Sequence, residues 1–181
     1  MNESAASAGK RSLSSIVDNI AGILDHGSGI LSTGDVADLR RMDPWNIRAP
    51  GFFKLVGAVL ETELPPGGTA REKAETRWAA VIVGLAHLGN LHRPGARLGS
   101  ALVDAGFSEV RFVRLLRADA DRLIDEVPAL ARFLAAKNVP ADFTAAARLV
   151  LSACRNDEEA TRRQLARDYY GALNQSKTKH D

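Results

Sequence analysis

The sequence lacks the features of secreted, membrane-spanning and disulfide-stabilised proteins. Its 181 residues include 1 cysteine, Cys154, so the chain can form neither an internal disulfide nor a cysteine-rich zinc site. No apolar run approaches the roughly 20 residues that a bilayer helix needs, because the best candidate, residues 78–91, contains His87 and Asn90. Residues 1–12 are polar and lack the apolar core of a secretory signal. We therefore expect a cytoplasmic protein with no membrane partner.

An excess of charge of one sign is almost absent too. The 24 Lys and Arg residues exceed the 22 Asp and Glu residues by 2, and aromatic residues make up only 6% of the chain. The hydrophobic share of 45% still suffices to bury a core, which excludes global disorder. Of the cations, 18 are Arg and 6 are Lys, and Arg suits bidentate phosphate contacts. A GC-rich genome would also enrich Arg, so composition alone does not identify a partner.

The spacing of apolar residues predicts the fold class. These residues recur at intervals of three and four rather than two, and Ala and Leu dominate, which is typical of α-helices. We find no alternating strand pattern of useful length, no internal repeat and no heptad run. The expected fold class is all-α, a helical bundle of about eight or nine helices. The expected helices cover residues 13–24, 33–42, 50–60, 69–88, 97–104, 109–117, 119–137, 143–153 and 157–173.

Capping residues and helix breakers set the expected boundaries. Thr69 and Glu72 have the spacing of a capping box, in which each side chain satisfies an orphan backbone donor. Gly27 is the expected C-cap of the first helix, and Pro128 marks a kink or a restart within residues 119–137. The other expected N-caps are Thr33, Ser108, Asp119 or Asp121, Asp142, and Asn156 or Asp157.

The chain is expected to have four segments. Residues 1–12 form a flexible N-terminal segment, and residues 175–181 form a frayed tail. Residues 13–95 form an N-terminal helical lobe and residues 96–174 a C-terminal one, packed against each other. Within the first lobe, the Leu-Pro-Pro-Gly-Gly stretch at residues 64–68 is the clearest linker, because Pro and Gly interrupt regular structure.

No constellation of residues supports catalysis. His87 and His92 lie on either side of an expected helix end, whereas a helical metal site needs His at i and i+4 with a carboxylate. Carboxylates cluster at residues 119–126, in the first turns of a helix, where the dipole favours anions. Cys154 has no His nearby in the sequence and is expected to be a small buried hydrophobe. We expect no catalytic site, no metal and no cofactor.

The arginines, by contrast, are segregated along the chain. Residues 93–117 hold 5 Arg against 2 acidic residues, a larger excess than that of the whole chain. Arg111, Arg114 and Arg117 step by three, so they span about 120° of one helix surface. Phe112, Leu115 and Leu116 are expected to point away from that surface, toward the core. This spacing predicts a basic stripe on a buried helix.

Further cations occur near other expected helix ends: Arg40, Arg41, Lys73, Arg77 and Arg93. A solvated helix face, or the preference of the helix dipole for cations at a C-terminus, would explain any one of them. Phosphate binding, in contrast, works through several spaced cations that release counterions together. The residues therefore favour a helical protein that binds nucleic acid or an acidic protein partner.

Three blocks of sequence point to a family. The first is Gly-Asp-Val-Ala-Asp-Leu-Arg-Arg at 34–41, followed by Ala-Pro-Gly-Phe-Phe-Lys-Leu-Val at 49–56. The second is Leu-Gly-Ser-Ala-Leu at 98–102 with Ser-Glu-Val-Arg-Phe-Val-Arg-Leu-Leu-Arg-Ala-Asp at 108–119. The third is Asp-Phe-Thr-Ala-Ala-Ala-Arg-Leu-Val at 142–150 with Arg-Gln-Leu-Ala-Arg-Asp-Tyr-Tyr at 163–170. Together they resemble the CasB small-subunit family of the type I-E CRISPR surveillance complex, Cascade.

The resemblance implies an all-helical protein without enzymatic activity. It implies two copies in the complex, placed along the crRNA and the backbone subunits and in contact with the large subunit. It also implies a basic surface that stabilises the R-loop by binding the backbones of the target and displaced DNA strands. Arg40 and Arg41 match the paired arginines of the first block. Arg111 and Arg117 match basic positions of the second block, whereas the position of Arg114 need not be basic in the family.

Two other classes remain open at this point. A scaffold could use the same arginines to bind acidic protein surfaces without touching nucleic acid. A hydrolase would require carboxylates or a histidine pair that converge only in the folded chain. Binding of unrelated DNA separates the first alternative from the family's function, and nuclease activity with and without a divalent metal tests the second.

Overall fold

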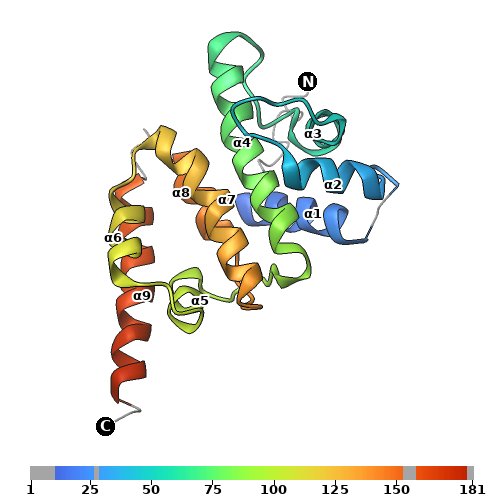
Figure 1. The fold of residues 1–181 in the computed structure, drawn as a ribbon. Helices are drawn as coiled ribbons and strands as arrows, with labels where there is room; N and C mark the ends of the chain where they lie inside the picture. The colour runs from blue at the N-terminus through green and yellow to red at the C-terminus, as the bar shows by residue number, and fades with distance from the viewer. Residues whose placement is uncertain (1–10, 27–28, 153–157, 179–181) are drawn as a thin grey trace, which may run out of the picture.

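The computed structural model describes residues 11–26, 29–152 and 158–178. It is 75% helical and contains no strand within those residues, which confirms the expected all-α class (Figure 1). A π-helical segment, η1 (Val56–Leu60), follows α3, and a 3-10 turn, η2 (Gly89–Leu91), follows α4. The α-helices of the described chain are α1 (Leu13–His26), α2 (Thr33–Arg41), α3 (Pro50–Leu55), α4 (Gly68–Leu88), α5 (Leu98–Asp104), α6 (Glu109–Arg117), α7 (Ala120–Ala136), α8 (Thr144–Ser152) and α9 (Glu158–Thr178).

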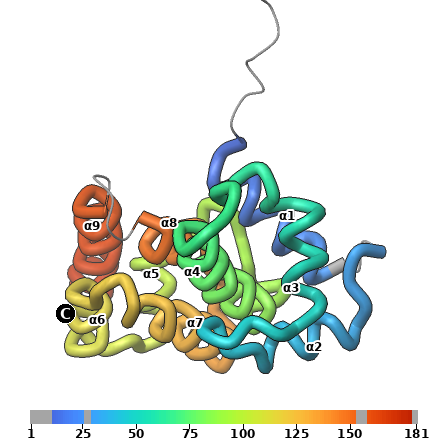
Figure 2. The backbone as a smooth tube through the Cα atoms, turned by 90° about the horizontal axis from the view of Figure 1, so that it is seen from above, coloured from blue at the N-terminus to red at the C-terminus, as the bar shows by residue number. Residues whose placement is uncertain are grey.

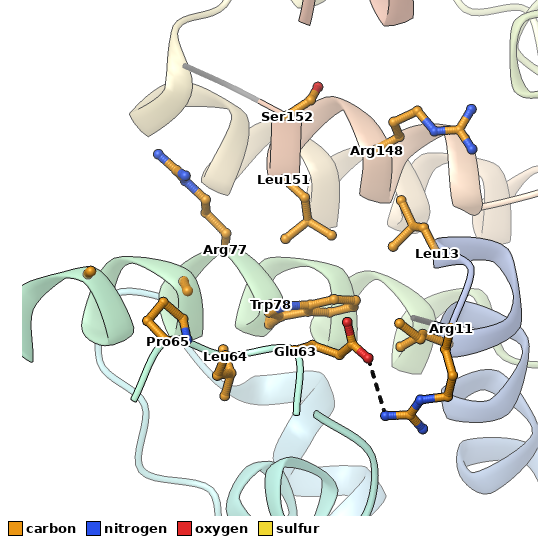
Figure 3. Close-up of a pocket in the computed structure, with 13 residues that line it drawn as sticks. Arg11, Leu13, Glu63, Leu64, Pro65, Arg77, Trp78, Arg148, Leu151 and Ser152 are labelled. Atoms are coloured by element: carbon orange, nitrogen blue, oxygen red, sulfur yellow. Dashed lines mark hydrogen bonds and ion pairs between the residues drawn. The ribbon is translucent and has the colours of Figure 1, made fainter. Parts of the chain in front are cut away.

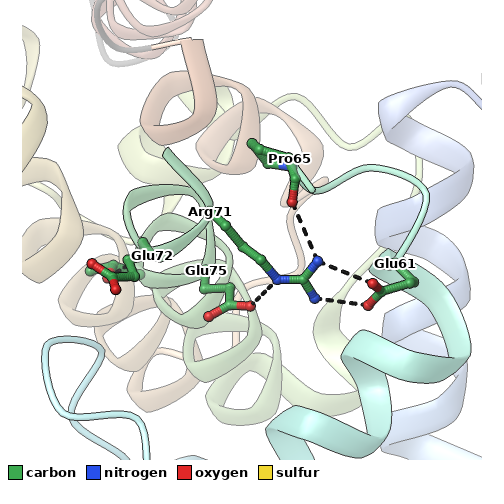
Figure 4. Close-up of polar contacts among 6 residues, drawn as sticks. Glu61, Pro65, Arg71, Glu72 and Glu75 are labelled. Atoms are coloured by element: carbon green, nitrogen blue, oxygen red, sulfur yellow. Dashed lines mark hydrogen bonds and ion pairs between the residues drawn. The ribbon is translucent and has the colours of Figure 1, made fainter. Parts of the chain in front are cut away.

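Two of the expected N-caps were wrong. The N-cap of α2 is Ser32 rather than Thr33, because the Ser32 hydroxyl accepts from the backbone N–H of Asp35 while the Asp35 carboxylate accepts from that of Ser32. The expected capping box of Thr69 and Glu72 is absent. Helix α4 begins instead after Gly67 without a side-chain cap. Figure 4 shows the Glu72 carboxylate pointing away from Arg71 and its polar contacts.

Other boundaries were confirmed or shifted slightly. Ser108 caps α6 and Asp119 caps α7, so Asp121 is not the cap, and α7 runs through Pro128 without a restart. The Asp142 carboxylate accepts from the backbone N–H of Thr144 at 2.9 Å, where α8 begins. Helix α9 extends to Thr178, so part of the expected frayed tail is helical. The expected caps Gly27, Asn156 and Asp157, and also Cys154, lie outside the described residues.

Helix α4 is the centre of the fold, with α1, α2, α7 and α8 packed around it (Figures 1 and 2). Its entire run from Trp78 to Ala86 is buried, on every side of the helix. A helix that is apolar on all sides must be surrounded by other elements. The predicted division into lobes 13–95 and 96–174 stays a prediction, and α7 and α8 pack across that boundary onto α4.

Helices α5, α6 and α9 form the opposite flank of the molecule from α1, α2 and α3 (Figures 1 and 2). Helix α5 packs along α9. The ring of Phe112 on α6 stacks on Tyr169 of α9 with the centroids 3.8 Å apart. The Tyr169 hydroxyl donates to the backbone carbonyl of Phe107 at 2.7 Å, which ties α9 to the turn that precedes α6. The position of α6 therefore depends on α9.

Helices α5 and α9 approach each other closely at Gly99. A Cβ atom at this position would lie 2.5 Å from the backbone nitrogen of Tyr169 and 2.7 Å from Cβ of Asp168. We expect Gly99→Ala to lower the free energy of unfolding by about 1 to 3 kcal/mol, because the backbone of α9 cannot move aside cheaply. Gly22→Ala in α1 is the matched control, since nothing lies within 4 Å of its Cβ. Urea unfolding measures both, and equal stability of the two variants would contradict the packing.

Candidate nucleic-acid interface

The basic stripe of α6 forms as the spacing predicts. Phe112 and Leu115 are buried, and Arg111, Arg114 and Arg117 are exposed on the other side of the helix. The Ser108 hydroxyl accepts from the backbone N–H of Arg111 and so fixes where the helix begins. Because α6 is held by its apolar side, its outer side presents the three arginines from a rigid backbone.

The three guanidinium groups differ in what they contact. Arg111 lies over the ring of Phe133 of α7, 5.9 Å from its centroid, within the range of a cation–π interaction. Arg114 approaches the Glu126 carboxylate at 3.8 Å, with 57% of its side chain exposed, so this ion pair is weak. Arg117 has no side-chain hydrogen bond or ion pair with any described residue. A phosphate could therefore bind Arg117, and Arg114 too, without breaking a strong contact.

Apolar side chains and a fourth arginine border the stripe. Val110 is 82% exposed. A shallow pocket of about 400 Å³ on the outer side of α6 is lined by Val110, Val113, Arg114, Arg117, Ala118 and Arg122. Arg122 comes from α7 and was missed in the sequence, although its spacing of four from Glu126 could have marked it as a surface cation. The exposed basic surface thus spans two helices rather than one.

Arg162 of α9 holds the C-terminal end of α6, which sequence reasoning also missed. Its guanidinium donates to the backbone carbonyls of Leu116 and Ala118, the latter at 2.7 Å, and forms an ion pair with Glu158 at 2.7 Å. The last carbonyls of a helix have no partner within the helix, so a cation there stabilises its end. Only the i,i+4 spacing of Glu158 and Arg162 was visible in the sequence, because Leu116 lies 46 residues away.

We expect Arg162→Met to lower the free energy of unfolding by about 1 to 3 kcal/mol, because it leaves two partly buried carbonyls unpaired. Arg163→Met is the matched control: Arg163 also pairs with a glutamate one turn earlier, Glu159, but 67% of its side chain is exposed. We expect little change for the control. Thermal unfolding compares the two variants, and equal loss in both would show that the carbonyl contacts do not matter.

The other predicted contacts lie apart from the stripe. Arg40 uses its Nε–H to donate to the backbone carbonyl of Ala86, at the C-terminal end of α4, at 2.7 Å. Arg41 is exposed and contacts only its own helix, α2, through Ala37 and, at 3.9 Å, Asp38. These two residues therefore belong to the α2–α4 side of the molecule.

Three further predicted cations also lie outside the stripe. Lys73 is exposed and Arg77 is half-buried in the first half of α4, about 20 Å and about 14 Å, respectively, along the helix axis from Ala86. Arg93 is exposed in the turn before α5, and its backbone N–H donates to Ala141. The structure thus brings together Arg111, Arg114 and Arg117 but separates the other predicted residues from them.

The acidic cluster beside the stripe has a structural role. Asp119 caps α7, as expected, and Asp125 accepts from the indole N–H of Trp45 at 2.9 Å. Trp45, which is 51% exposed, comes from the loop between α2 and α3. This contact joins that loop to α7. The local acids also offset the arginines of α6 and α7, which explains why the net charge conceals the stripe.

The two histidines of interest hold structural positions. His92 is nearly buried; its Nε2 contacts the Asp18 carboxylate of α1 at 2.8 Å, and its Nδ1 accepts from the backbone N–H of Phe143 at 3.2 Å. Nε2 of His87 is buried with no hydrogen-bond partner within the described residues. Burial lowers the pKa of His87, and the positive charges of Arg132 and Arg40 lower it further. In the part of the chain that the structure describes, no three His, Cys, Asp or Glu side chains are placed to hold a metal.

His87 links stability to pH. Its pKa is below its ordinary value of 6.5 in the folded protein, so the unfolded chain binds the proton more tightly. Above about pH 6.5 the histidine is neutral in both the folded and the unfolded chain, and the free energy of unfolding does not change with its titration. As the pH falls from about 6.5 through the lowered pKa of the folded protein, the free energy of unfolding decreases. We expect His87→Gln to flatten the decline in unfolding free energy between about pH 7.5 and pH 5, measured by urea titrations.

Arg132→Gln provides an independent check of the same linkage. It removes one of the charges that lower the His87 pKa, so the decline should become smaller while the histidine remains. Unchanged pH profiles in both variants would contradict the assignment.

Comparison with known proteins supports one family. A family model of the CRISPR-associated protein Cse2 matches residues 35–170, which include α2 from its third residue and most of α9. No curated protein and no solved structure matches the chain. Among the described residues, no helix is both long and apolar enough to cross a membrane. The match covers most of the chain and includes the three sequence blocks apart from Gly34, so the chain belongs to the Cse2 (CasB) family, the structural small subunit of Cascade.

Proposed function

We propose that this Cascade subunit binds the backbone of nucleic acid through the stripe of Arg111, Arg114 and Arg117 and so stabilises the crRNA-guided R-loop in antiviral defence. The observation that carries this proposal is the geometry of α6: three arginines on one exposed side of a helix that α7 and α9 hold in place. Arg122 extends the same surface. The partners are crRNA and both DNA strands, bound in the cytoplasm.

The spacing of the stripe supports contacts to a backbone. Arg111 and Arg117 are six residues apart, about 9 Å along the helix axis. One strand of a duplex carries a phosphate every 3.4 Å or so along its axis, so the stripe can reach about two or three phosphates. The exposed side of α6 offers arginines and valines, and at least half of all protein–DNA hydrogen bonds go to phosphate and sugar rather than to bases. We expect binding at the stripe to depend more on charge than on base sequence.

Small contributions can decide R-loop stability. The RNA–DNA heteroduplex is about as stable as the DNA duplex that it replaces, so contacts to the backbone can tip the exchange. An arginine that is already held in place loses less conformational freedom on binding than a free one. The packing of Arg111 on Phe133 thus favours its use as a phosphate ligand. Arg40, Arg41, Lys73 and Arg93 are secondary candidates on other surfaces, where the backbone and large subunits and a second copy of this chain would also bind.

The test is the double variant Arg111→Ala with Arg117→Ala. We expect weaker binding to unrelated single-stranded and duplex DNA, because each arginine removed lowers the number of counterions released. The slope of log affinity against log salt should become shallower by about 0.7 to 0.9 for each lost contact. Fluorescence anisotropy with labelled oligonucleotides at several salt concentrations measures both the affinity and the slope.

A matched control carries the same change in charge elsewhere. Arg48 and Arg163 are exposed and each contacts a neighbour in its own segment, Asn46 and Glu159 respectively. The variant Arg48→Ala with Arg163→Ala should bind nearly as wild type. If the α6 variant matches wild type in affinity and slope at every salt concentration, the stripe is not the interface. If wild type itself binds no DNA, the alternative of a scaffold for acidic protein surfaces is favoured.

A further inference from the structure

A second charged site lies on another face, between α1, α4, α8 and the segment that joins η1 to α4. It is a pocket of about 630 Å³ (Figure 3). Its walls include Leu13 and Ile16 of α1, Ala70 and Ala74 of α4, and Leu151 of α8. This pocket contains none of the residues of the α6 stripe, and α6 is on the opposite flank from α1 (Figures 1 and 2).

One wall of the pocket is fixed by Arg71, so the opening does not depend on a loose linker. The Arg71 guanidinium contacts the Glu61 carboxylate at 2.8 and 3.0 Å and Glu75 at 2.8 Å (Figure 4). It also donates to the backbone carbonyl of Pro65 at 3.3 Å. The hydrogen bonds that Arg71 donates to the carboxylates of Glu61 and Glu75 raise its pKa, so it stays charged. The segment 61–65 is thereby held against α4.

The floor of the pocket is aliphatic. Figure 3 shows Leu13 and Leu151 facing the side chain of Trp78 across the centre of the pocket. Trp78 itself is only 5% exposed, so its indole offers almost no open face. Stacking of nucleic-acid bases requires an accessible aromatic face. An aliphatic depression of this kind suits a branched apolar side chain better than it suits a base.

Arginines surround this floor. Arg11 is already engaged, because its guanidinium donates to Val59 and Thr62 and pairs with Glu63 at 3.5 Å. Arg77 and Arg148, in contrast, have no ion pair or hydrogen bond from their side chains within the described chain. Figure 3 shows their guanidinium groups at opposite ends of the apolar floor. The pocket therefore carries two uncompensated positive charges, one at each end.

Ser152 adds an unsatisfied polar group at the pocket. The residue is 3% exposed, and its hydroxyl has no hydrogen-bond partner among the described residues. A buried hydroxyl without a partner is costly, so native proteins rarely leave one without a reason.

We propose that this pocket docks an acidic segment of a partner protein, with one leucine-like side chain on the aliphatic floor and carboxylates on Arg77 and Arg148. The charge of the rim selects the acids, since Arg forms bidentate contacts with carboxylates. The leucine-like side chain on the apolar floor would act as the anchor, because a few buried residues provide most of the binding energy in protein interfaces. Arg77, which the sequence grouped with the nucleic-acid contacts, belongs to this site.

The experiment uses full-length protein and short fluorescein-labelled peptides. The main probe has a central leucine flanked on both sides by aspartates and glutamates. One control peptide has serine in place of the leucine, and another has lysines in place of the acids. We expect the main probe to bind with a Kd of about 10 to 100 μM by anisotropy, and both control peptides to bind at least about tenfold more weakly.

Two orthogonal double variants locate the binding. Arg77→Glu with Arg148→Glu should weaken peptide binding by at least about tenfold and leave DNA binding nearly unchanged. Arg111→Glu with Arg117→Glu, an equal change in charge, should do the reverse. Ala70→Trp, at an exposed position on the wall, should block the peptide sterically without altering charge.

Four outcomes would overturn the proposal. They are no binding of the acidic peptide up to about 1 mM, equal binding of the serine or lysine peptides, DNA binding that falls with the Arg77 and Arg148 reversal, and loss of self-association on that reversal. The third would make the pocket a nucleic-acid contact, and the fourth would make it a contact between two copies. If the acidic peptide does not bind, the proposed role of α6 in DNA binding still stands, because DNA binding is measured with a different pair of variants.

Discussion

The enclosure of α4 by α1, α2, α7 and α8 is the constraint on which the remaining structure depends. From Trp78 to Ala86 every residue is buried, so each neighbouring helix must supply an apolar side toward it. Burial of apolar area, at about 25 cal/mol per Å², is the dominant favourable contribution to folding. Because the C-terminal half of α4 is buried in this way, the charged surfaces of the molecule lie at the N-terminal turns of α4 and on helices at the periphery.

Helix α6 is such a peripheral helix, and its position is determined by distant parts of the chain. Tyr169 stacks on its inner side, Arg162 holds its C-terminal carbonyls, and Phe133 supports Arg111. A short helix is marginal by itself, since most helical stability in proteins comes from packing. The stripe is thus held rigid from α9 and α7, and rigid cations bind phosphates with less loss of conformational freedom than flexible ones.

The stripe on α6 and the pocket beside α4 differ in shape and in the arrangement of their charges. The stripe on α6 combines exposed arginines with a convex helix, which suits a polyanion that extends past it. The pocket beside α4 combines two separated arginines with an aliphatic floor, which suits a partner that enters it. Acids on α7 and elsewhere balance the arginines numerically, so the net charge of +2 describes neither surface. Separate surfaces would let one small subunit contact nucleic acid and another protein at the same time.

Features that depend on neighbours within one or two helical turns could be predicted from the sequence. The helix periods, the caps at Ser108 and Asp119 and the spacing of the α6 arginines follow from local geometry, and these predictions were confirmed. Contacts between residues far apart in the chain became visible only in the folded protein. The Arg162 side chain donates to the backbone carbonyl of Leu116, 46 residues away in the sequence. Arg77 and Arg148 line the same pocket because α8 packs against α4. The spacing of residues along the sequence does not predict such long-range contacts, since they depend on how whole helices pack.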